Sequence, residues 1–179
     1  GKSSLLSLLG LLERPTAGDV LIRGRSTVGL HDRQLAAHRA RHLGFVFQDH
    51  LVSAHLTVRE SLELAMRYRE LPRSDRQAEA HRVLGFVGLA DKASVRGRTL
   101  SGGERQRISI ARALVGRVDI LLCDEPTGNL DSTNAQNVVD LLQQAAADGA
   151  TVVVVTHDEA VAAAMDRRIT IVDGSVADA

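Results

Sequence analysis

Short apolar runs that alternate with helical segments limit this chain to a small set of folds. Three such runs lie at residues 43–47, 119–123 and 151–155. Runs of this kind are typical of strands buried on both faces, as in a parallel sheet. Helical patterns separate them, chiefly at residues 56–70, 74–87, 104–115 and 132–147. The alternation predicts an α/β fold in which a largely parallel sheet is flanked by helices.

Shorter elements complete the expected fold. They are a turn and strand at 18–22, helices at 31–42 and 158–165, and a final strand at 168–172. Between Gln48 and Leu100 the sequence predicts only helix and loop. We therefore expect a helical subdomain at approximately residues 49–100, within a single domain that spans residues 1–179.

Composition argues against several classes of function. Basic and acidic residues number 22 each, so the net charge is +0 and does not indicate a nucleic-acid partner. A single cysteine allows no intrachain disulfide, which is typical of the reducing cytoplasm. The longest apolar run, residues 150–156, is too short to cross a bilayer. Any role at a membrane is therefore expected to be peripheral.

Two adjacent carboxylates follow one of the buried strands. Asp124 and Glu125 come directly after the apolar residues 120–123. Carboxylate oxygens are ligands that Mg²⁺ accepts, and a second carboxylate beside the metal can polarise an attacking water. The alternative is an ordinary pair of acids that caps a turn at the strand end. Cys123 is interpreted as a small core residue, because free cysteines are commonly buried.

A glycine-rich segment near the middle of the chain precedes a helix. Ser101, Gly102 and Gly103 would leave backbone N–H groups bare at a helix N-terminus, where negative charge is favoured. The alternative is a capping box, in which Ser101 and Glu104 cap the helix reciprocally. That alternative does not explain two consecutive glycines ahead of a buried helix.

The first residues match part of another anion-binding pattern. Gly1, Lys2 and Ser3 agree with the last three positions of the phosphate-binding loop G-x-x-x-x-G-K-[ST]. A chance match is the alternative for so short a segment.

In order, these segments resemble the motifs of ABC transporter ATP-binding subunits. Leu100 to Arg107 resembles the ABC signature motif, which is highly specific for this family. The other segments resemble the end of Walker A at 1–3, the Q-loop at 47–48, Walker B at 120–125, the D-loop at 129–131 and the switch histidine at 157. The resemblance covers essentially the whole chain. Residues 124–131 most resemble ATPases of lipoprotein-releasing, macrolide-export and FtsX-like systems.

The resemblance implies ATP and Mg²⁺ as ligands and assigns a role to each matching residue. Glu125 would be the general base on water, His157 would contact the γ-phosphate, and Gln48 would sense both the phosphate and the metal. The implied phosphate-binding residues of the chain's own site are Gly1, Lys2, Ser3 and Ser4. The implied metal-binding residues are Ser3, Gln48 and Asp124.

The remaining implied roles need a second subunit. Ser101, Gly102 and Gly103 would bind the γ-phosphate of the ATP held by the opposite subunit, and Asp131 would communicate across the interface. The resemblance thus implies a head-to-tail homodimer, a transmembrane permease as partner, and a place on the cytoplasmic face of the plasma membrane. It also implies that further strands, most of Walker A and an adenine-stacking aromatic precede Gly1. Without them we expect weak ATP binding.

Alternatives within the same ATPase superfamily remain at this stage. Heads of DNA-repair and chromosome-structuring ATPases carry long coiled coils between Q-loop and signature, whereas here 53 positions separate Gln48 from Ser101. A translation-factor ATPase would normally carry two heads in one chain. A non-catalytic head is the third alternative, and the presence of Glu125 and His157 argues against it.

Overall fold

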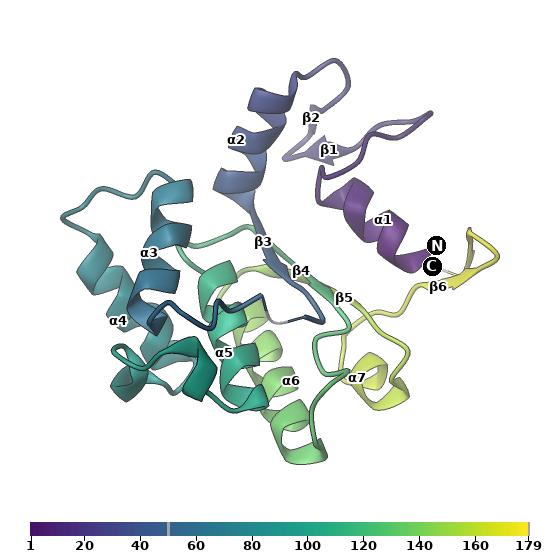
Figure 1. The fold of residues 1–179 in the computed structure, drawn as a ribbon. Coiled ribbons are helices and arrows are strands. Elements are labelled where there is room, and N and C mark those ends of the chain that lie inside the picture. Colours follow the sequence, from purple (N-terminus) through teal and green to yellow (C-terminus); the bar gives the residue numbers. More distant parts are fainter. Residues whose placement is uncertain (50, 179) are drawn as a thin grey trace.

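A three-stranded parallel sheet forms the centre of the protein (Figure 1). The computed structural model describes residues 1–49 and 51–178. In the sheet, β4 (Ile120–Asp124) lies between β3 (Leu43–Val46) and β5 (Thr151–Val155). Leu43 pairs with Ile120 and Ile120 with Thr151, so the three strands begin in register, and β3 ends one residue before the other two. The expected parallel sheet is therefore confirmed.

Helices cover both faces of this sheet. α5 (Gly102–Ala113) and α6 (Ser132–Ala147) lie on one side, and α1 (Lys2–Leu9) lies on the other (Figure 1). Leu121 and Cys123 of β4 are fully buried, as continuous apolar strands between two helical layers should be. Close packing of α5 on β3 requires Gly44, because a Cβ there would lie 2.5 Å from the Ala113 carbonyl oxygen.

The segment after β3 is built from helices. α3 (Val58–Tyr68) and α4 (Arg76–Phe86) are followed by the 3₁₀ turns η1 (Ala90–Lys92) and η2 (Gly97–Thr99). Thr57 caps α3 and receives a hydrogen bond from the Glu60 backbone N–H. The buried side chains of α3 and α4 belong to the same apolar core as those of α5 and β4.

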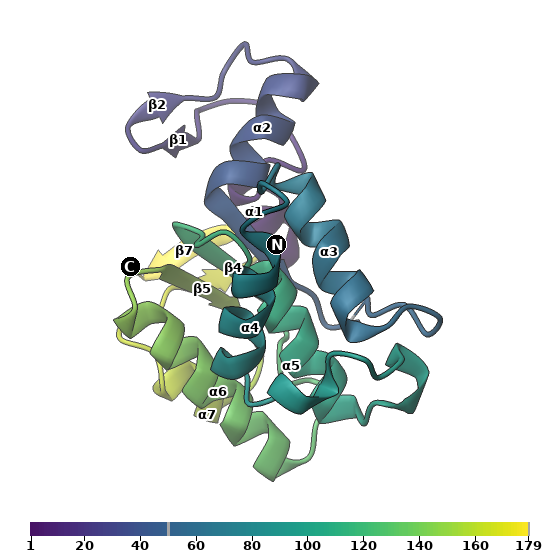
Figure 2. The same cartoon turned by 90° about the vertical axis from the view of Figure 1, so that its left-hand side faces the viewer.

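Two small hairpins and two helices complete the described structure. β1 (Leu21–Ile22) pairs antiparallel with β2 (Arg25–Ser26), and β6 (Thr170–Val172) pairs antiparallel with β7 (Ser175–Asp178). α2 (Asp32–His42) leads directly into β3, and α7 (Glu159–Ala163) follows β5. Figure 2 shows the β1–β2 hairpin beside α2, away from α6 and α7.

Several expected boundaries differ from the structure by one to three residues, and two of these differences have a local reason. The helix expected after Gly103 begins at Gly102, because Ser101 is its N-cap and the glycines form its first turn. The strand expected from Arg168 begins at Thr170, because its backbone pairing with β7 begins there, opposite Asp178. That strand belongs to a hairpin and not to the parallel sheet.

Candidate active site

The polar residues that follow the three parallel strands lie along one edge of the sheet. Gln48 follows β3, Asp124 ends β4 and Glu125 follows it, and His157 follows β5. Because parallel strands direct their carboxyl ends to the same edge, residues distant in sequence meet there. The structure therefore brings together the residues expected for catalysis.

The Glu125 carboxylate makes two side-chain contacts at this edge. Its Oε1 lies 2.8 Å from Nδ1 of His157, and its Oε2 accepts a hydrogen bond from the Thr156 hydroxyl at 3.3 Å. The Glu125 side chain is 16% exposed, whereas that of His157 is 75% exposed. A sheltered carboxylate thus lies beside an imidazole that faces solvent.

The backbone of Glu125 has an unusual conformation. Its φ is 46°, in the left-handed region that residues other than glycine rarely adopt. Its backbone N–H donates to the Val155 carbonyl at 2.8 Å, which extends the β4–β5 pairing by one residue. The strand pairing therefore holds the residue in this conformation, which directs its side chain towards His157.

The start of α1 faces the same edge. Ser3 Oγ lies 3.5 Å from Asp124 Oδ1. A hydroxyl and a carboxylate that face each other are a suitable oxygen donor pair for Mg²⁺. No side chain caps the N-terminus of α1, where Gly1 is the N-cap and Lys2, Ser3 and Ser4 form an exposed first turn. The first N–H groups of this helix are therefore available to an anion such as a phosphate.

Gln48 lies against the loop that follows Glu125. A Cβ built on Gly128 would lie 3.3 Å from Gln48 Nε2. The side chain is exposed and belongs to the strand-end group, as expected. Within the described residues there is no cluster of three or more His, Cys, Asp or Glu that could hold a metal. A metal here would thus depend on mixed oxygen donors of the Ser3 and Asp124 kind.

The glycine-rich helix start is a capping box. The Ser101 hydroxyl accepts from the Glu104 N–H at 3.2 Å, and the Ser101 N–H donates to the Glu104 carboxylate at 2.8 Å. This backbone hydrogen bond keeps the pKa of Glu104 below its usual value. Ser101 itself is exposed. Among the residues that the structure describes, no hydrogen bond joins Ser101, Gly102 or Gly103 to the Glu125 group of the same chain.

Asp131 lies at the start of α6 and approaches the glycine-rich segment through Asn134. The Asp131 carboxylate caps α6 by accepting from the Asn134 N–H at 2.9 Å and from its side-chain amide at 2.7 Å. The backbone hydrogen bond lowers the pKa of Asp131. Asn134 in turn fills the space beside Gly103, because a Cβ on Gly103 would collide with its amide.

Two contributors to the site were not predicted from the sequence. Gln106 is fully buried, and its Nε2 donates to the Pro126 carbonyl at 2.6 Å, so it ties α5 to the loop beside Glu125. Gln106 could have been found from the sequence, because it is a polar residue four positions before Ile110, on the apolar face of α5. Thr156 is the second contributor, because its hydroxyl donates a hydrogen bond to the Glu125 carboxylate. Cys123 is buried as expected, and burial raises the pKa of its thiol.

The sheet with helices on both faces and the polar edge together define a nucleotide-binding cassette of the α/β class. A family model described as ABC transporter matches residues 1–128, so the chain belongs to the ABC transporter family. The family resemblance of the motifs is thereby confirmed.

Similar proteins come from curated sequences and from solved structures. The chain is 43% identical over 176 residues to the macrolide export ATP-binding/permease protein MacB of Hahella chejuensis, and 44% identical to that of Burkholderia cenocepacia. Each alignment covers 98% of this chain but only 27% and 26% of those proteins. The chain therefore spans about a quarter of the length of these relatives.

Two solved structures share the fold. The ATP-binding cassette MJ0796, as a dimer in a post-hydrolysis state with ADP and Pi, is 38% identical with a TM-score of 0.87. A second dimeric structure of this bacterial ABC transporter cassette gives a TM-score of 0.88 at 38% identity. Both comparisons cover 99% of this chain and 79% of the solved one. No helix in the described part of the chain is long and apolar enough to span a membrane.

Proposed function

We propose that this chain binds and hydrolyses ATP and thereby drives an ABC transporter. The observation that carries this proposal is the contact between Glu125 and His157 at the edge where Ser3 also meets Asp124. Hydrolysis of a phosphoanhydride needs a base for water and positive or hydrogen-bonding groups for the phosphates. This edge of the sheet offers a carboxylate as the base, and hydrogen-bonding and positive groups for the phosphates. The cassette MJ0796 was solved with ADP and Pi, which supports the same chemistry.

In this proposal Glu125 accepts the proton of the attacking water. Since a carboxylate can only accept a hydrogen bond, Nδ1 of His157 carries the proton in their 2.8 Å contact. His157 thus orients the base, and its exposed ring can contact the γ-phosphate. Gln48, on the loop beside Gly128, would contact the attacking water or the metal.

The start of α1 would bind the phosphates. Lys2 supplies a positive charge, and the uncapped N–H groups after Gly1 supply donors. Ser3 and Asp124 would hold Mg²⁺, which when bound screens the negative charge of the phosphate oxygens. Ser4 lies in the same exposed turn.

A second copy of the chain would complete the site. Ser101, Gly102 and Gly103 do not meet Glu125 within one chain, yet Ser101 is exposed at a helix N-terminus suited to an anion. A head-to-tail dimer would place this segment on the γ-phosphate bound by the partner, with Asp131 at the interface. The dimeric structures of the 38% identical cassette support this arrangement.

The transporter would be an exporter of the macrolide-export kind. Relatives of this chain are named as export ATP-binding/permease proteins. A permease partner would place the chain on the cytoplasmic face of the plasma membrane, with residues 49–100 as a helical subdomain next to it. No nucleic acid is proposed as a partner. A permease gene beside the coding region would favour transport over DNA repair or translation.

Glu125→Gln in the full-length protein tests the catalytic assignment. A glutamine retains the acceptor oxygen for His157 but cannot take a proton, so ATP turnover should fall about 100-fold or more while ATP binding persists. Glu70→Gln is the matched control, because Glu70 is exposed just after α3 and its side chain makes no hydrogen bond in the described structure. Steady-state phosphate release and equilibrium binding of ATP measure the two effects. Turnover at the wild-type rate in Glu125→Gln would remove Glu125 from this role.

A further inference from the structure

The loop that follows Glu125 is tied to α5 by a buried glutamine. Gln106 is fully buried, and its Nε2 donates a hydrogen bond of 2.6 Å to the carbonyl oxygen of Pro126. Pro126 is buried as well, and a proline has no N–H, so its carbonyl is its one polar backbone group. Leaving such a buried carbonyl without a donor costs free energy. Gln106 therefore fixes the residue next to the proposed base.

Three hydrogen bonds fix the backbone around Glu125. Its N–H donates to the Val155 carbonyl at 2.8 Å, and its carbonyl accepts from the Gly128 N–H at 3.1 Å. The third is the bond from Gln106 to the Pro126 carbonyl, and it is the one that a side chain supplies. The φ of 46° at Glu125 is a costly conformation, which persists only where the surrounding structure enforces it. Removal of the Gln106 donor is therefore expected to let this loop relax and to shift the Glu125 carboxylate.

Gln106 shares α5 with the glycine-rich start, but it faces a different part of the molecule. It lies five residues after Ser101, about 7.5 Å along the helix axis. Ser101 is exposed and is bonded to Glu104 of its own helix, whereas Gln106 points into the core towards Pro126. One helix thus carries a surface that we propose for the partner's nucleotide and a side chain directed to the Glu125 loop of its own chain.

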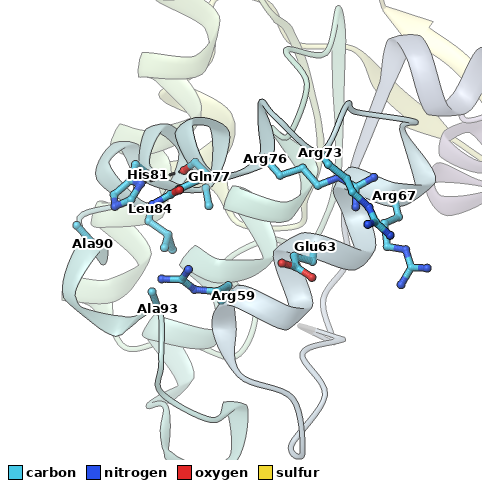
Figure 3. A pocket seen from close by; sticks show the side chains of 11 residues that line it. Arg59, Glu63, Arg67, Arg73, Arg76, Gln77, His81, Leu84, Ala90 and Ala93 are labelled. Atoms are coloured by element: carbon cyan, nitrogen blue, oxygen red, sulfur yellow. Dashed lines mark hydrogen bonds between the residues drawn. The ribbon is translucent and has the colours of Figure 1, made fainter.

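The helical segment after β3 has no part in this contact. Side chains of α3 and α4, among them Arg59, Glu63 and Arg76, line a cleft between these two helices (Figure 3). Neither Gln106 nor Pro126 belongs to the residues that line this cleft. Changing Gln106 therefore alters the loop after Glu125 without altering a residue of the cleft.

We propose that Gln106 is a positioning residue for ATP hydrolysis, which holds the Glu125 carboxylate of its own chain where it can accept the proton of water. This inference rests on the proposed function, since it concerns the same site. Gln106 acts through the Pro126 carbonyl and the Glu125 backbone, and not on the substrate. The phosphates are instead assigned to the start of α1, which is a separate element. Loss of the Gln106 bond therefore lowers the rate of turnover and leaves the affinity for ATP unchanged.

Gln106→Met in the full-length protein tests this split between rate and affinity. Methionine is flexible and similar in length, so it fills the same space without donating to Pro126. We expect kcat to fall about tenfold or more, because small displacements of a catalytic group are costly, with KM and the equilibrium affinity for ATP unchanged. Gln143→Met is the matched control, because Gln143 Nε2 also donates to a backbone carbonyl, that of Ala164 at 2.8 Å, outside the Glu125 loop. An unchanged kcat in Gln106→Met, or a raised KM at unchanged kcat, would overturn the proposal.

The double variant Gln106→Met with Glu125→Gln tests whether Gln106 acts through Glu125. Because the base is then already absent, the methionine should cause no further loss of the residual turnover, which single-turnover measurements resolve. The same loss in both backgrounds would mean that Gln106 acts elsewhere. Wild-type turnover in Glu125→Gln alone would instead contradict the proposed function itself.

Mixed dimers show which chain's base Gln106 serves. Gly102→Arg blocks the start of α5, so its mixture with Gln106→Met leaves one site with a positioned base and an open helix start. This mixture should recover about a quarter of wild-type turnover by random pairing. A mixture of Gln106→Met with Glu125→Gln should show no gain over its components, because both sites then lack a positioned base. The reverse pattern, or recovery in neither mixture, would overturn the proposal.

Gln106→Glu is the second variant if Gln106→Met does not fold. Glutamate has the shape of glutamine, but its carboxyl donates to the Pro126 carbonyl only when it is protonated. Burial raises the pKa of a carboxyl, so the protonated fraction grows as pH falls. The turnover of this variant relative to wild type should therefore rise from about pH 8 to about pH 6. A ratio that does not change with pH would count against the bond to Pro126.

Discussion

Single residues at the two edges of the sheet hold the site in shape and join neighbouring elements. At the carboxyl edge, Glu125 adopts a φ of 46°, and conformations of this kind cost free energy and tend to occur at functional sites. At the opposite edge, Asp119 precedes β4. Its Oδ2 accepts a hydrogen bond from Arg23 Nε at 3.0 Å and lies 2.5 Å from Nδ1 of His42. Asp119 thereby joins the β1–β2 turn and the end of α2 to the central strand.

The Asp119 cluster predicts a dependence of stability on pH. Burial acts to raise the pKa of Asp119, but the hydrogen bonds from Arg23 and His42 outweigh it, so the net shift is downward. A lowered folded-state pKa stabilises the protein above the unfolded pKa of about 4 and loses this effect as pH falls through the folded value. Asp119→Asn should lower the free energy of unfolding by about 1 kcal/mol at pH 7 and by less at acid pH.

Urea denaturation of both proteins between neutral and acid pH measures this difference. Asp166→Asn is the control, because Asp166 is exposed and makes no hydrogen bond in the described residues. A difference between wild type and Asp119→Asn that grows as pH falls would contradict the sign of this effect.

Helix starts are the elements on which the proposed site depends most. The first turn of α5 contains Gly102 and Gly103, and these two glycines have different surroundings. A Cβ on Gly102 would meet nothing within 4 Å, whereas a Cβ on Gly103 would collide with the Asn134 amide. Asn134 is held by Asp131, so α5 and α6 fix each other's N-termini through this contact.

Substitution by alanine is therefore expected to affect the free energy of unfolding differently at the two glycines. Gly103→Ala must displace Asn134 and break its bond to Asp131, which should lower the free energy of unfolding by about 1–2 kcal/mol. Gly102→Ala should leave stability unchanged or raise it slightly, since alanine favours a helix over glycine. Thermal and urea unfolding of both variants measure this. Equal destabilisation by the two changes would show that the contact with Asn134 is not the cause.

Sequence patterns predicted some elements well and others poorly. The parallel strands could be predicted because a strand buried on both faces must be apolar at every position, as residues 120–123 are. Asp124 and Glu125 could be placed at an edge of the sheet, because they follow directly where this apolar run ends. The pairing of β6 with β7 could not, because short hairpins carry no long-range pattern. The roles of Gln106 and Asn134 also depend on contacts between elements that only the folded chain shows.

At the scale of the whole molecule, the proposed site is divided between two surfaces. One surface is the sheet edge with Ser3, Asp124, Glu125 and His157, and the other is the start of α5. Within the described residues no hydrogen bond connects them. Two copies related by a two-fold axis can supply each surface to the other, which closes the assembly with two equivalent sites.

Mixing two inactive variants of the full-length protein tests this central claim most directly. Glu125→Gln removes the base, and Gly102→Arg blocks the helix start without meeting a neighbour at its Cβ. In a mixed dimer one site has both defects and the other has neither, so an equimolar mixture should recover about a quarter of wild-type ATP turnover by random pairing. Each variant alone should be nearly inactive. A mixture as inactive as its components, or full activity of Gly102→Arg alone, would contradict a site shared between two chains.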